Sequence, residues 1–473
     1  MSKPEKTGRE NLRHVPSVDQ LLRTEAAREL RGLVGIRRLT NIARSVTAEI
    51  RSLVQNDAGS SAFNGDYAEA LLREAIKRME ANARSEGQAG IKNVINATGV
   101  VLHTNLGRAP LSQSARAAID EAARYCSVEY NLESGMRGGR AARVESLLKD
   151  LSGAEDALVV NNCAAAALLI LTVLARDGET IVSRGELVEI GGDFRVPDVM
   201  ASSGTRMIEV GTTNRTHLED YRRAITPDTR LIMRVHPSNY RIVGFASSPS
   251  VSELSTLARE AGLPLYEDAG SGQLKDLQQY GVNDEPVVRE LIESGVDVVS
   301  FSGDKLLGSA QAGLIVGTHA IVARLRKHPL YRALRSDKLR LAALEATLVS
   351  HQRDVAESEV PVIQLLSLTA KDIDQRAQAL IQGLNTEELK FELLLGESVL
   401  GGGAGPASTF PTTLIAITHV SKPAQEIEHR LRNSSPPIIT RISEGKVLLD
   451  LRTVFEDQIP AIRAAFSHGL HGL

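Results

Sequence analysis

A lysine held between two apolar segments is the first residue whose position suggests chemistry. Residues 298–316 read VVSFSGDKLLGSAQAGLIV, which places Lys305 in a short turn rich in glycine and serine. Apolar runs bounded by such residues predict a buried strand over 298–301 and a second strand after Gly313. Lys305 is then either a solvated turn residue, as many turn residues are, or an amine held in place to bond a carbonyl cofactor.

The cofactor interpretation makes a further demand, because pyridoxal phosphate also needs a carboxylate beside its pyridine nitrogen. Asp268 is the candidate, at the end of a short apolar strand that begins near Leu263. Residues 285–294 leave room for a crossover helix, so the strands that precede Asp268 and Lys305 can lie parallel in one sheet. Both residues would then lie at the carboxyl ends of strands, where open α/β sheets bind ligands.

A phosphate site is predicted where a third strand runs into a helix. Residues 157–168 read ALVVNNCAAAAL, and the helix would begin at Asn162, Cys163 and Ala164. Free backbone amides at a helix start bind a phosphate dianion with help from the helix dipole, and Ser302 could add a hydroxyl. Cys163 could also be a small residue packed beneath the cofactor. With an amine, a carboxylate and a phosphate site in order, the sequence predicts a pyridoxal-phosphate site.

Arginines and one histidine are further candidates near this site. Arg108 lies in the glycine-containing loop HTNLGR, where its guanidinium could hold an anion or pair with a surface acid. Arg332 and Arg335 are three residues apart on a predicted helix, so they would share a face that could hold a phosphate-like group or pair with acids. His236 follows a predicted strand and could touch the cofactor or substrate, or be a structural histidine.

Strands and helices alternate after residue 93, which predicts an α/β fold with a mostly parallel sheet covered on both faces. We expect an N-terminal helical domain over 1–92, a large cofactor-binding domain over 93–340 and a small C-terminal α/β domain over 341–473. The glycine-rich run 401–405 lacks the strand–turn–helix context of a dinucleotide motif and is expected to be a flexible loop.

Composition limits the class of protein. The chain of 473 residues has a formal net charge of −3, whereas residues 1–92 hold 16 Lys and Arg against 12 Asp and Glu, so any RNA contact would be local. The longest apolar run, 163–175, is too short to cross a bilayer, and the N-terminus lacks the apolar core of a signal peptide. We expect a cytoplasmic protein. Two cysteines without zinc-ligand spacing predict no metal.

Several strings of the sequence carry a resemblance to a known family. They are SGDKLLG around Lys305, INATGVVLHTNLGRAPL at 95–111, SRGELVEIG at 183–191 and VPSVDQLL at 15–22. Together they resemble bacterial selenocysteine synthases, the L-seryl-tRNA(Sec) selenium transferases, and the resemblance extends nearly end to end. Members of that family commonly have Gly-Pro after the lysine turn, where this chain has Ser309-Ala310.

The resemblance implies a pyridoxal-phosphate enzyme of the aspartate-aminotransferase fold type (fold type I) that converts seryl-tRNA(Sec) to selenocysteinyl-tRNA(Sec) through a cofactor-bound aminoacrylate. Lys305 would bond the cofactor and then act as general base, Asp268 would keep the pyridine nitrogen protonated, and Asp304 or a water would protonate the leaving hydroxyl. Selenophosphate would be held by Arg108, Arg332 and Arg335. The helical domain would bind the tRNA. The protein would be a homo-oligomer, either a dimer or a larger ring.

Two alternatives remain at this point. A pyridoxal-phosphate lyase that acts on a free small amino acid would need no tRNA, and its turnover would not depend on residues 1–92. An RNA-binding protein with a vestigial cofactor fold would not form the visible covalent complex with the cofactor at Lys305.

Overall fold

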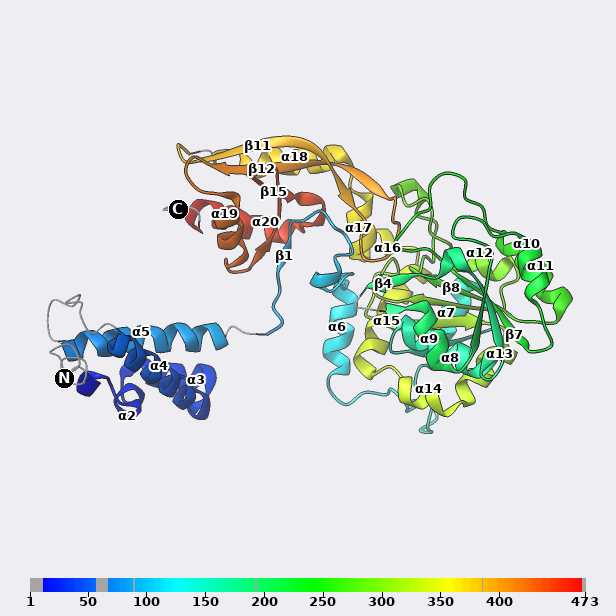
Figure 1. Cartoon of the computed structure of the whole chain (residues 1–473), viewed down its shortest axis with the longest axis horizontal. Coiled ribbons are helices and arrows are strands. Elements are labelled where there is room, and N and C mark those ends of the chain that lie inside the picture. Colours follow the sequence, from blue (N-terminus) through cyan, green and yellow to red (C-terminus); the bar gives the residue numbers. More distant parts are fainter. Residues whose placement is uncertain (1–11, 57–66, 88–89, 192–193, 385, 470–473) are drawn as a thin grey trace. The chain divides into compact units, whose positions relative to one another are not determined.

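The computed structural model describes residues 12–56, 67–87, 90–191, 194–384 and 386–469. The chain divides into two compact units, Met1–Asn93 and Val94–Leu473, which are described separately below (Figure 1).

The first unit is a small helical bundle. Its core holds Leu21, Leu39, Ile50 and Met79, all with no more than 1% of their surface exposed. Gly35, with φ of 75°, separates the helix that ends at Val34 from the one that begins at Ile36. Residues other than glycine rarely adopt this backbone conformation. The elements are the 3₁₀ turn η1 (Leu12–His14), α2 (Val18–Leu22), α3 (Glu25–Val34), α4 (Ile36–Asn56) and α5 (Tyr67–Gly87).

A seven-stranded sheet forms the centre of the second unit. The strand order is β2-β10-β9-β8-β7-β3-β6, and β10 alone runs antiparallel to its neighbours. The predicted α/β class with a mostly parallel sheet is therefore confirmed. The strands are β2 (Asp156–Val160), β3 (Glu179–Ser183), β6 (Arg206–Val210), β7 (Thr229–Val235), β8 (Leu265–Gly270), β9 (Val298–Ser302) and β10 (Gly313–Gly317).

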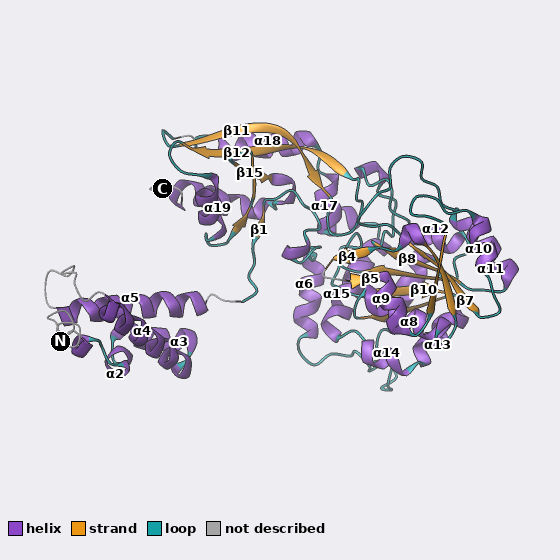
Figure 2. Cartoon of the chain, in the orientation of Figure 1, coloured by secondary structure: helices purple, strands orange, loops and turns teal. Residues whose placement is uncertain are grey.

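Helices cover both faces of this sheet (Figures 1 and 2). Alternate residues of a strand point to opposite faces, and β9 shows the result, because Val299 and Phe301 join one apolar core and Val298 joins the other. The helices are α6 (Gln113–Ala122), α7 (Ala142–Ser152), α8 (Cys163–Ala175), α9 (Val196–Ser203), α10 (Leu218–Ala224), α11 (Val251–Ala261), α12 (Val288–Glu293), α13 (His319–Lys327), α14 (Pro329–Leu334) and α15 (Lys338–Gln352). The short hairpin β4 (Glu189–Gly191) and β5 (Phe194–Arg195) precedes α9.

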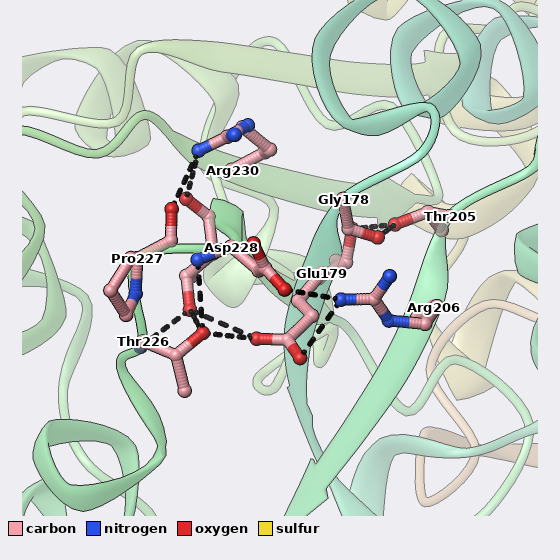
Figure 3. Close-up of polar contacts among 10 residues, drawn as sticks. Gly178, Glu179, Thr205, Arg206, Thr226, Pro227, Asp228 and Arg230 are labelled. Atoms are coloured by element: carbon pink, nitrogen blue, oxygen red, sulfur yellow. Dashed lines mark hydrogen bonds and ion pairs between the residues drawn. The ribbon is translucent and has the colours of Figure 1, made fainter.

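A polar network fixes the amino ends of three neighbouring strands (Figure 3). Arg206 at the start of β6 contacts Glu179 at the start of β3 (3.3 Å) and Asp228 just before β7 (2.8 Å). The hydroxyl of Thr226 donates to the second oxygen of Glu179 at 2.5 Å. These contacts hold the register at the end of the sheet opposite to the candidate site.

The C-terminal part has its own antiparallel sheet with strand order β11-β12-β15-β14. A hairpin turn at 443–446 joins β14 to β15. The elements are α16 (Ala356–Glu359), α17 (Pro361–Ser367), α18 (Ala370–Ile381), β11 (Leu389–Val399), β12 (Thr409–His419), α19 (Ala424–Arg432), β13 (Ile438–Ile439), β14 (Arg441–Ser443), β15 (Lys446–Asp450) and α20 (Ile459–Ala464). β1 (Ile95–Asn96) pairs in parallel with β13, so the start of the second unit packs into this C-terminal core.

A further apolar cluster of the second unit joins loops of the large domain to the C-terminal part. It contains Leu102, Leu306 and Leu400, which belong to the three loops that carry Arg108, Lys305 and the glycine run 401–405. Burial of these leucines therefore brings the three loops together at one place. In the described part of the chain, no helix has the length and apolar character needed to cross a bilayer.

Candidate active site

Asp268 and Lys305 come from adjacent parallel strands. Asp268 lies in β8 opposite Ser300 of β9, and Lys305 follows the end of β9 by three residues. The crossover between the strands contains α12, as the sequence predicts. Lys305 is only 4% exposed, so the interpretation as a solvated turn residue is wrong.

The carboxylate of Asp268 is held by a small buried network. Its Oδ1 accepts hydrogen bonds from Ser300 Oγ (3.1 Å) and Cys163 Sγ (3.3 Å), and Ser300 also bonds the hydroxyl of Tyr266 (2.8 Å). Burial raises the pKa of Asp268, while the donors Cys163 and Ser300 and the charge of Lys305 act to lower it. Both side-chain donors act on Oδ1, so neither competes for Oδ2. Sequence reasoning missed Ser300 and Tyr266, although Ser300 lies two residues from Ser302 on the same strand face.

The amine of Lys305 is buried in polar surroundings. Its Nζ donates to the carbonyl oxygen of Gly403 at 2.9 Å. Burial lowers the pKa of Lys305 and the charge of Arg108 adds to this, while Cys163, Asp268 and Asp304 oppose it. A lowered pKa leaves more of the amine unprotonated and therefore nucleophilic.

The amino terminus of α8 faces the same end of the sheet. Asn162 is its N-cap, and the side-chain oxygen of Asn162 accepts from the amide of Ala165 at 2.8 Å. The amides of Cys163 and Ala164 precede the first amide that can bond within the helix, so they can serve an anion. Ser302 is buried at the end of β9. The amine, the carboxylate and this helix start fit pyridoxal phosphate.

Asp304 and Arg108 form an ion pair beside Lys305. Arg108 Nη1 lies 2.8 Å from Asp304 Oδ2, and the amide of Ala109 donates to the carbonyl oxygen of Asp304 at 3.3 Å. One of the two expectations for Arg108 was pairing with a surface acid; Arg108 does pair with an acid, but that acid, Asp304, is buried. Arg108 Nε is buried without a hydrogen-bond partner among the described residues, so part of the guanidinium stays available for an anion.

His236 follows β7, and its amide donates to the carbonyl oxygen of Asp268 at 3.0 Å. Its ring nitrogen Nε2 lies 3.3 Å from the buried carboxylate of Glu285. His236 therefore contacts Asp268 only through the backbone, while its ring lies against Glu285. Glu285 was not expected from the sequence, because an acid in a loop between strand and helix is usually exposed.

A second buried charge cluster supports β7 and β8 beneath the site. Arg234 Nη1 lies 3.1 Å from Glu267 Oε2, and Glu186 accepts the amide of Val235 at 3.1 Å. Burial raises the pKa of Glu186 to about 8, against which the charge of Arg234 acts. Sequence reasoning did not single out these residues, because only the three-dimensional contacts show that they meet.

Comparison with known proteins adds to this geometry. The profile of the family described as L-seryl-tRNA selenium transferase matches residues 94–455. The L-seryl-tRNA(Sec) selenium transferase of Moorella thermoacetica is 45% identical over 466 residues, which cover 98% of this chain and 97% of that protein. The enzyme of the same name from Geobacter metallireducens is 45% identical over 459 residues, covering 96% and 98%. This chain belongs to the L-seryl-tRNA selenium transferase family.

The family predicted from the sequence is therefore confirmed. Among solved structures, D-glucosaminate-6-phosphate ammonia-lyase superposes on this family member with a TM-score of 0.57 at 22% identity, covering 79% of this chain and 95% of that one. At this identity the likeness concerns the fold alone.

The remaining arginines of this selenium transferase family member lie elsewhere than expected. Arg332 is exposed on α14, but α14 ends at Leu334, and Arg335 has extended backbone with φ of −61° and ψ of 134°. The prediction that they share a helix face is wrong, because residue 335 bridges to Val160 at the end of β2 instead of continuing the helix. Arg335 Nη1 lies 3.7 Å from Glu129 Oε1. Among the described residues, no contact joins either arginine to Lys305.

Proposed function

We propose that this chain converts L-seryl-tRNA(Sec) to L-selenocysteinyl-tRNA(Sec) with pyridoxal phosphate as cofactor and selenophosphate as selenium donor. The observation that carries the proposal is the meeting of Lys305 and Asp268 at the ends of two adjacent parallel strands. Family membership over almost the whole chain supports the tRNA-linked substrate, since the relatives that match are named for it. The same match does not favour a lyase for free amino acids.

Each part of the cofactor has a partner in this chain. Lys305 would bond its aldehyde, Asp268 would hold its ring nitrogen, and the amides of Cys163 and Ala164 with the hydroxyl of Ser302 would bind its phosphate. When bound, pyridoxal phosphate supplies an electron sink for breaking the bond between the seryl Cα and its proton. The donors on Asp268 Oδ1 favour the carboxylate that a protonated ring nitrogen requires.

The residues around Lys305 would handle protons and the selenium donor. The amine of Lys305, whose pKa is lowered by burial, can take the Cα proton as general base. Asp304 or a water would give a proton to the leaving hydroxyl; Asp304, the residue before Lys305, would first have to take up a proton, because it is a carboxylate in its ion pair with Arg108. Arg108 would bind selenophosphate through charge-assisted hydrogen bonds, and we propose Arg332 and Arg335 as further ligands of that anion.

The helical unit would bind the tRNA through its exposed arginines. Arg31 on α3 and Arg37 and Arg44 on α4 are exposed, as is Arg38, which pairs with Glu86. Phosphate contacts of this kind supply affinity without reading sequence. Removal of residues 1–92 is expected to raise KM for the tRNA substrate strongly. An aminoacyl-tRNA substrate also supports a cytoplasmic location.

We infer that the protein acts as a homo-oligomer, either a dimer or a larger ring. Large apolar side chains stand exposed on the loop that joins α6 to α7, namely Tyr130, Leu132 and Met136, with 54%, 79% and 68% of their surfaces exposed. A cluster of this kind on one loop is typical of an interaction surface. Light scattering on the full chain tests this inference, and a monomer at micromolar concentration would contradict it.

The test of the proposed function compares seryl-tRNA(Sec) with free serine as substrate, in the presence of selenophosphate. Turnover of the tRNA substrate alone is expected, together with a visible absorption band of bound cofactor that Lys305→Ala abolishes. Preference for free serine would overturn the proposal. Arg206→Ala is the matched control, because Arg206 is the first residue of β6 and lies at the amino ends of the strands, whereas Lys305 and Asp268 lie at their carboxyl ends.

A further inference from the structure

The glycine run Gly401–Gly405 lies between β11 and β12 and reaches the amine of Lys305. Gly401, Gly402, Gly403 and Gly405 have φ angles of 73°, 66°, 74° and 52°, a region that other residues disfavour. A Cβ on Gly401 would lie 2.4 Å from a side-chain carbon of Val100, and one on Gly402 would lie 2.4 Å from the carbonyl oxygen of Leu102. This segment, called the glycine loop below, therefore needs glycine for both its conformation and its packing.

Two hydrogen bonds attach the glycine loop to the site. The carbonyl oxygen of Gly403 accepts from Lys305 Nζ at 2.9 Å, and the amide of Gly405 donates to Glu285 Oε1. The side chain of Glu285 is fully buried, and its Oε1 also lies 3.3 Å from His236 Nε2. Because the amide of His236 donates to the carbonyl oxygen of Asp268 on β8, a continuous path of contacts runs from the lysine through the loop to the strand end that bears the acid.

We propose that the glycine loop binds the Lys305 amine, through the carbonyl oxygen of Gly403, whenever that amine is not bonded to the cofactor. Glu285 then holds the loop in place as a positioning residue. This inference rests on the proposed function, because that function requires a substrate amine to replace Lys305 on the aldehyde carbon. In that exchange the bond from this carbon to Nζ breaks, a bond to the incoming nitrogen forms, and one proton passes from the incoming nitrogen to Nζ.

A backbone carbonyl suits this task better than a carboxylate would. The released amine is buried, and a buried donor without an acceptor is costly. A carbonyl oxygen accepts a hydrogen bond from an amine as well as from an ammonium, so Lys305 can take up and release a proton without losing its partner. A carboxylate in the same place would favour the ammonium and weaken the base.

Glu285 explains how a loop of glycines can stay in position. Gly405 offers only its backbone, so the loop needs a fixed acceptor from outside. The buried carboxylate of Glu285 provides one, and its position next to His236 ties it to the large sheet. Its second oxygen, Oε2, has no hydrogen-bond partner among the described residues, so the carboxylate is not held by a competing network.

The experiment measures how readily an amine displaces Lys305 from the cofactor. The full chain is saturated with pyridoxal phosphate and titrated with serine methyl ester, which carries the same acyl group as the tRNA substrate. Borohydride then reduces the remaining bond to Lys305, and mass spectrometry of the peptide that contains Lys305 gives the displaced fraction. This reading is an equilibrium and needs no turnover.

Loss of the hydrogen bond from Lys305 to the glycine loop should destabilise the released amine, so a higher ester concentration is needed to displace half of Lys305 from the cofactor. In Glu285→Ala and in Gly402→Ala the midpoint concentration is expected to rise about fivefold, which corresponds to about 1 kcal/mol for one hydrogen bond. Glu285→Gln keeps an acceptor for Gly405 and should stay within about twofold of the wild type. Gly445→Ala is the matched control, because Gly445 also has positive φ (72°) but has nothing within 4 Å of the added Cβ.

An unchanged midpoint in either Glu285→Ala or Gly402→Ala overturns the inference, because both variants act through the same hydrogen bond to Lys305. If Gly445→Ala shifts as much as Gly402→Ala, the effect is general strain and the inference also fails. Absence of cofactor on Lys305 in the wild type would instead refute the proposed function, so the two failures can be distinguished.

Discussion

Replacement of Ser300 by alanine tests the electrostatics of the site most directly. Its hydroxyl joins two groups, Asp268 Oδ1 at 3.1 Å and the hydroxyl of Tyr266 at 2.8 Å. Ser300 and Tyr266 are fully buried, so water cannot easily replace the lost hydroxyl. Ser300→Ala therefore removes one donor from the carboxylate and leaves a tyrosine hydroxyl without its partner.

The size of the effect follows from the type of hydrogen bond. A hydrogen bond to a charged group contributes about 1.5–3 kcal/mol, and one pKa unit corresponds to about 1.4 kcal/mol. Because the donor stabilises the ionised form, its loss should raise the pKa of Asp268 by about one to two units beyond the rise already caused by burial. The thiol of Cys163 remains, but it is a weak donor.

The assay is the affinity for pyridoxal phosphate as a function of pH, followed by equilibrium dialysis. Binding of a protonated ring nitrogen requires the carboxylate, so affinity falls on the acid side as Asp268 is protonated. In Ser300→Ala this acid limb should move up by about one to two pH units. Ser152→Ala is a matched control, because Ser152 is also fully buried and donates to a backbone carbonyl far from the site at 2.6 Å. An acid limb that does not move in a folded Ser300→Ala protein would refute the reasoning.

Two further predictions concern the stability of the sheet. The pKa of Glu186 is about 8 in the folded protein against 4.5 ordinarily, so its contribution to stability is largest below pH 4.5 and is lost as pH rises to about 8. The free energy of unfolding should therefore fall by at most about 1.4 kcal/mol per pH unit in this range. Glu186→Gln should make this fall less steep between pH 5 and 8 in urea unfolding, and an unchanged slope would contradict the prediction. Arg206→Ala breaks exposed ion pairs with Glu179 and Asp228, in which the Arg206 side chain is 55% exposed, so the free energy of unfolding should change little. Cofactor affinity should be unchanged, and a loss of cofactor affinity would show that the network of Figure 3 reaches the site.

The fold was accessible from the sequence because the strands of a sheet covered by helices on both faces are buried on both sides and read as short apolar runs. Residues 298–301 and 313–316 show this pattern, and both are strands of the structure. The position of Asp268 relative to Lys305 followed from the same pattern, since a helix between two strands makes them parallel and brings their carboxyl ends together. Local sequence was enough at these places because the relevant contacts lie between neighbouring strands.

Contacts between distant segments could not be predicted in this way. Gly403 meets Lys305 across 98 residues, and Gly405 meets Glu285 across 120. The glycine run was expected to be a flexible loop, because it lacks the strand–turn–helix context of a dinucleotide motif. Glycine has no side chain whose pattern would reveal a partner. Arg335 shows the opposite error: the spacing was helical, but a bridge to Val160 ended the helix one residue earlier.

The ion pair between Arg108 and Asp304 gives a physical reason why Lys305 can serve as a base. Lys305 has two acids nearby, Asp268 and Asp304, and each alone would favour its ammonium form. Arg108 lies 2.8 Å from Asp304, so the charge of that acid is largely balanced before it acts on the lysine. Burial then outweighs the remaining attraction, and the pKa of Lys305 falls. The guanidinium of Arg108, which could bind an anionic selenium donor, therefore also lowers the pKa of the Lys305 amine. These two roles give a reason why the loop with positive φ at Arg108 is held against the lysine turn.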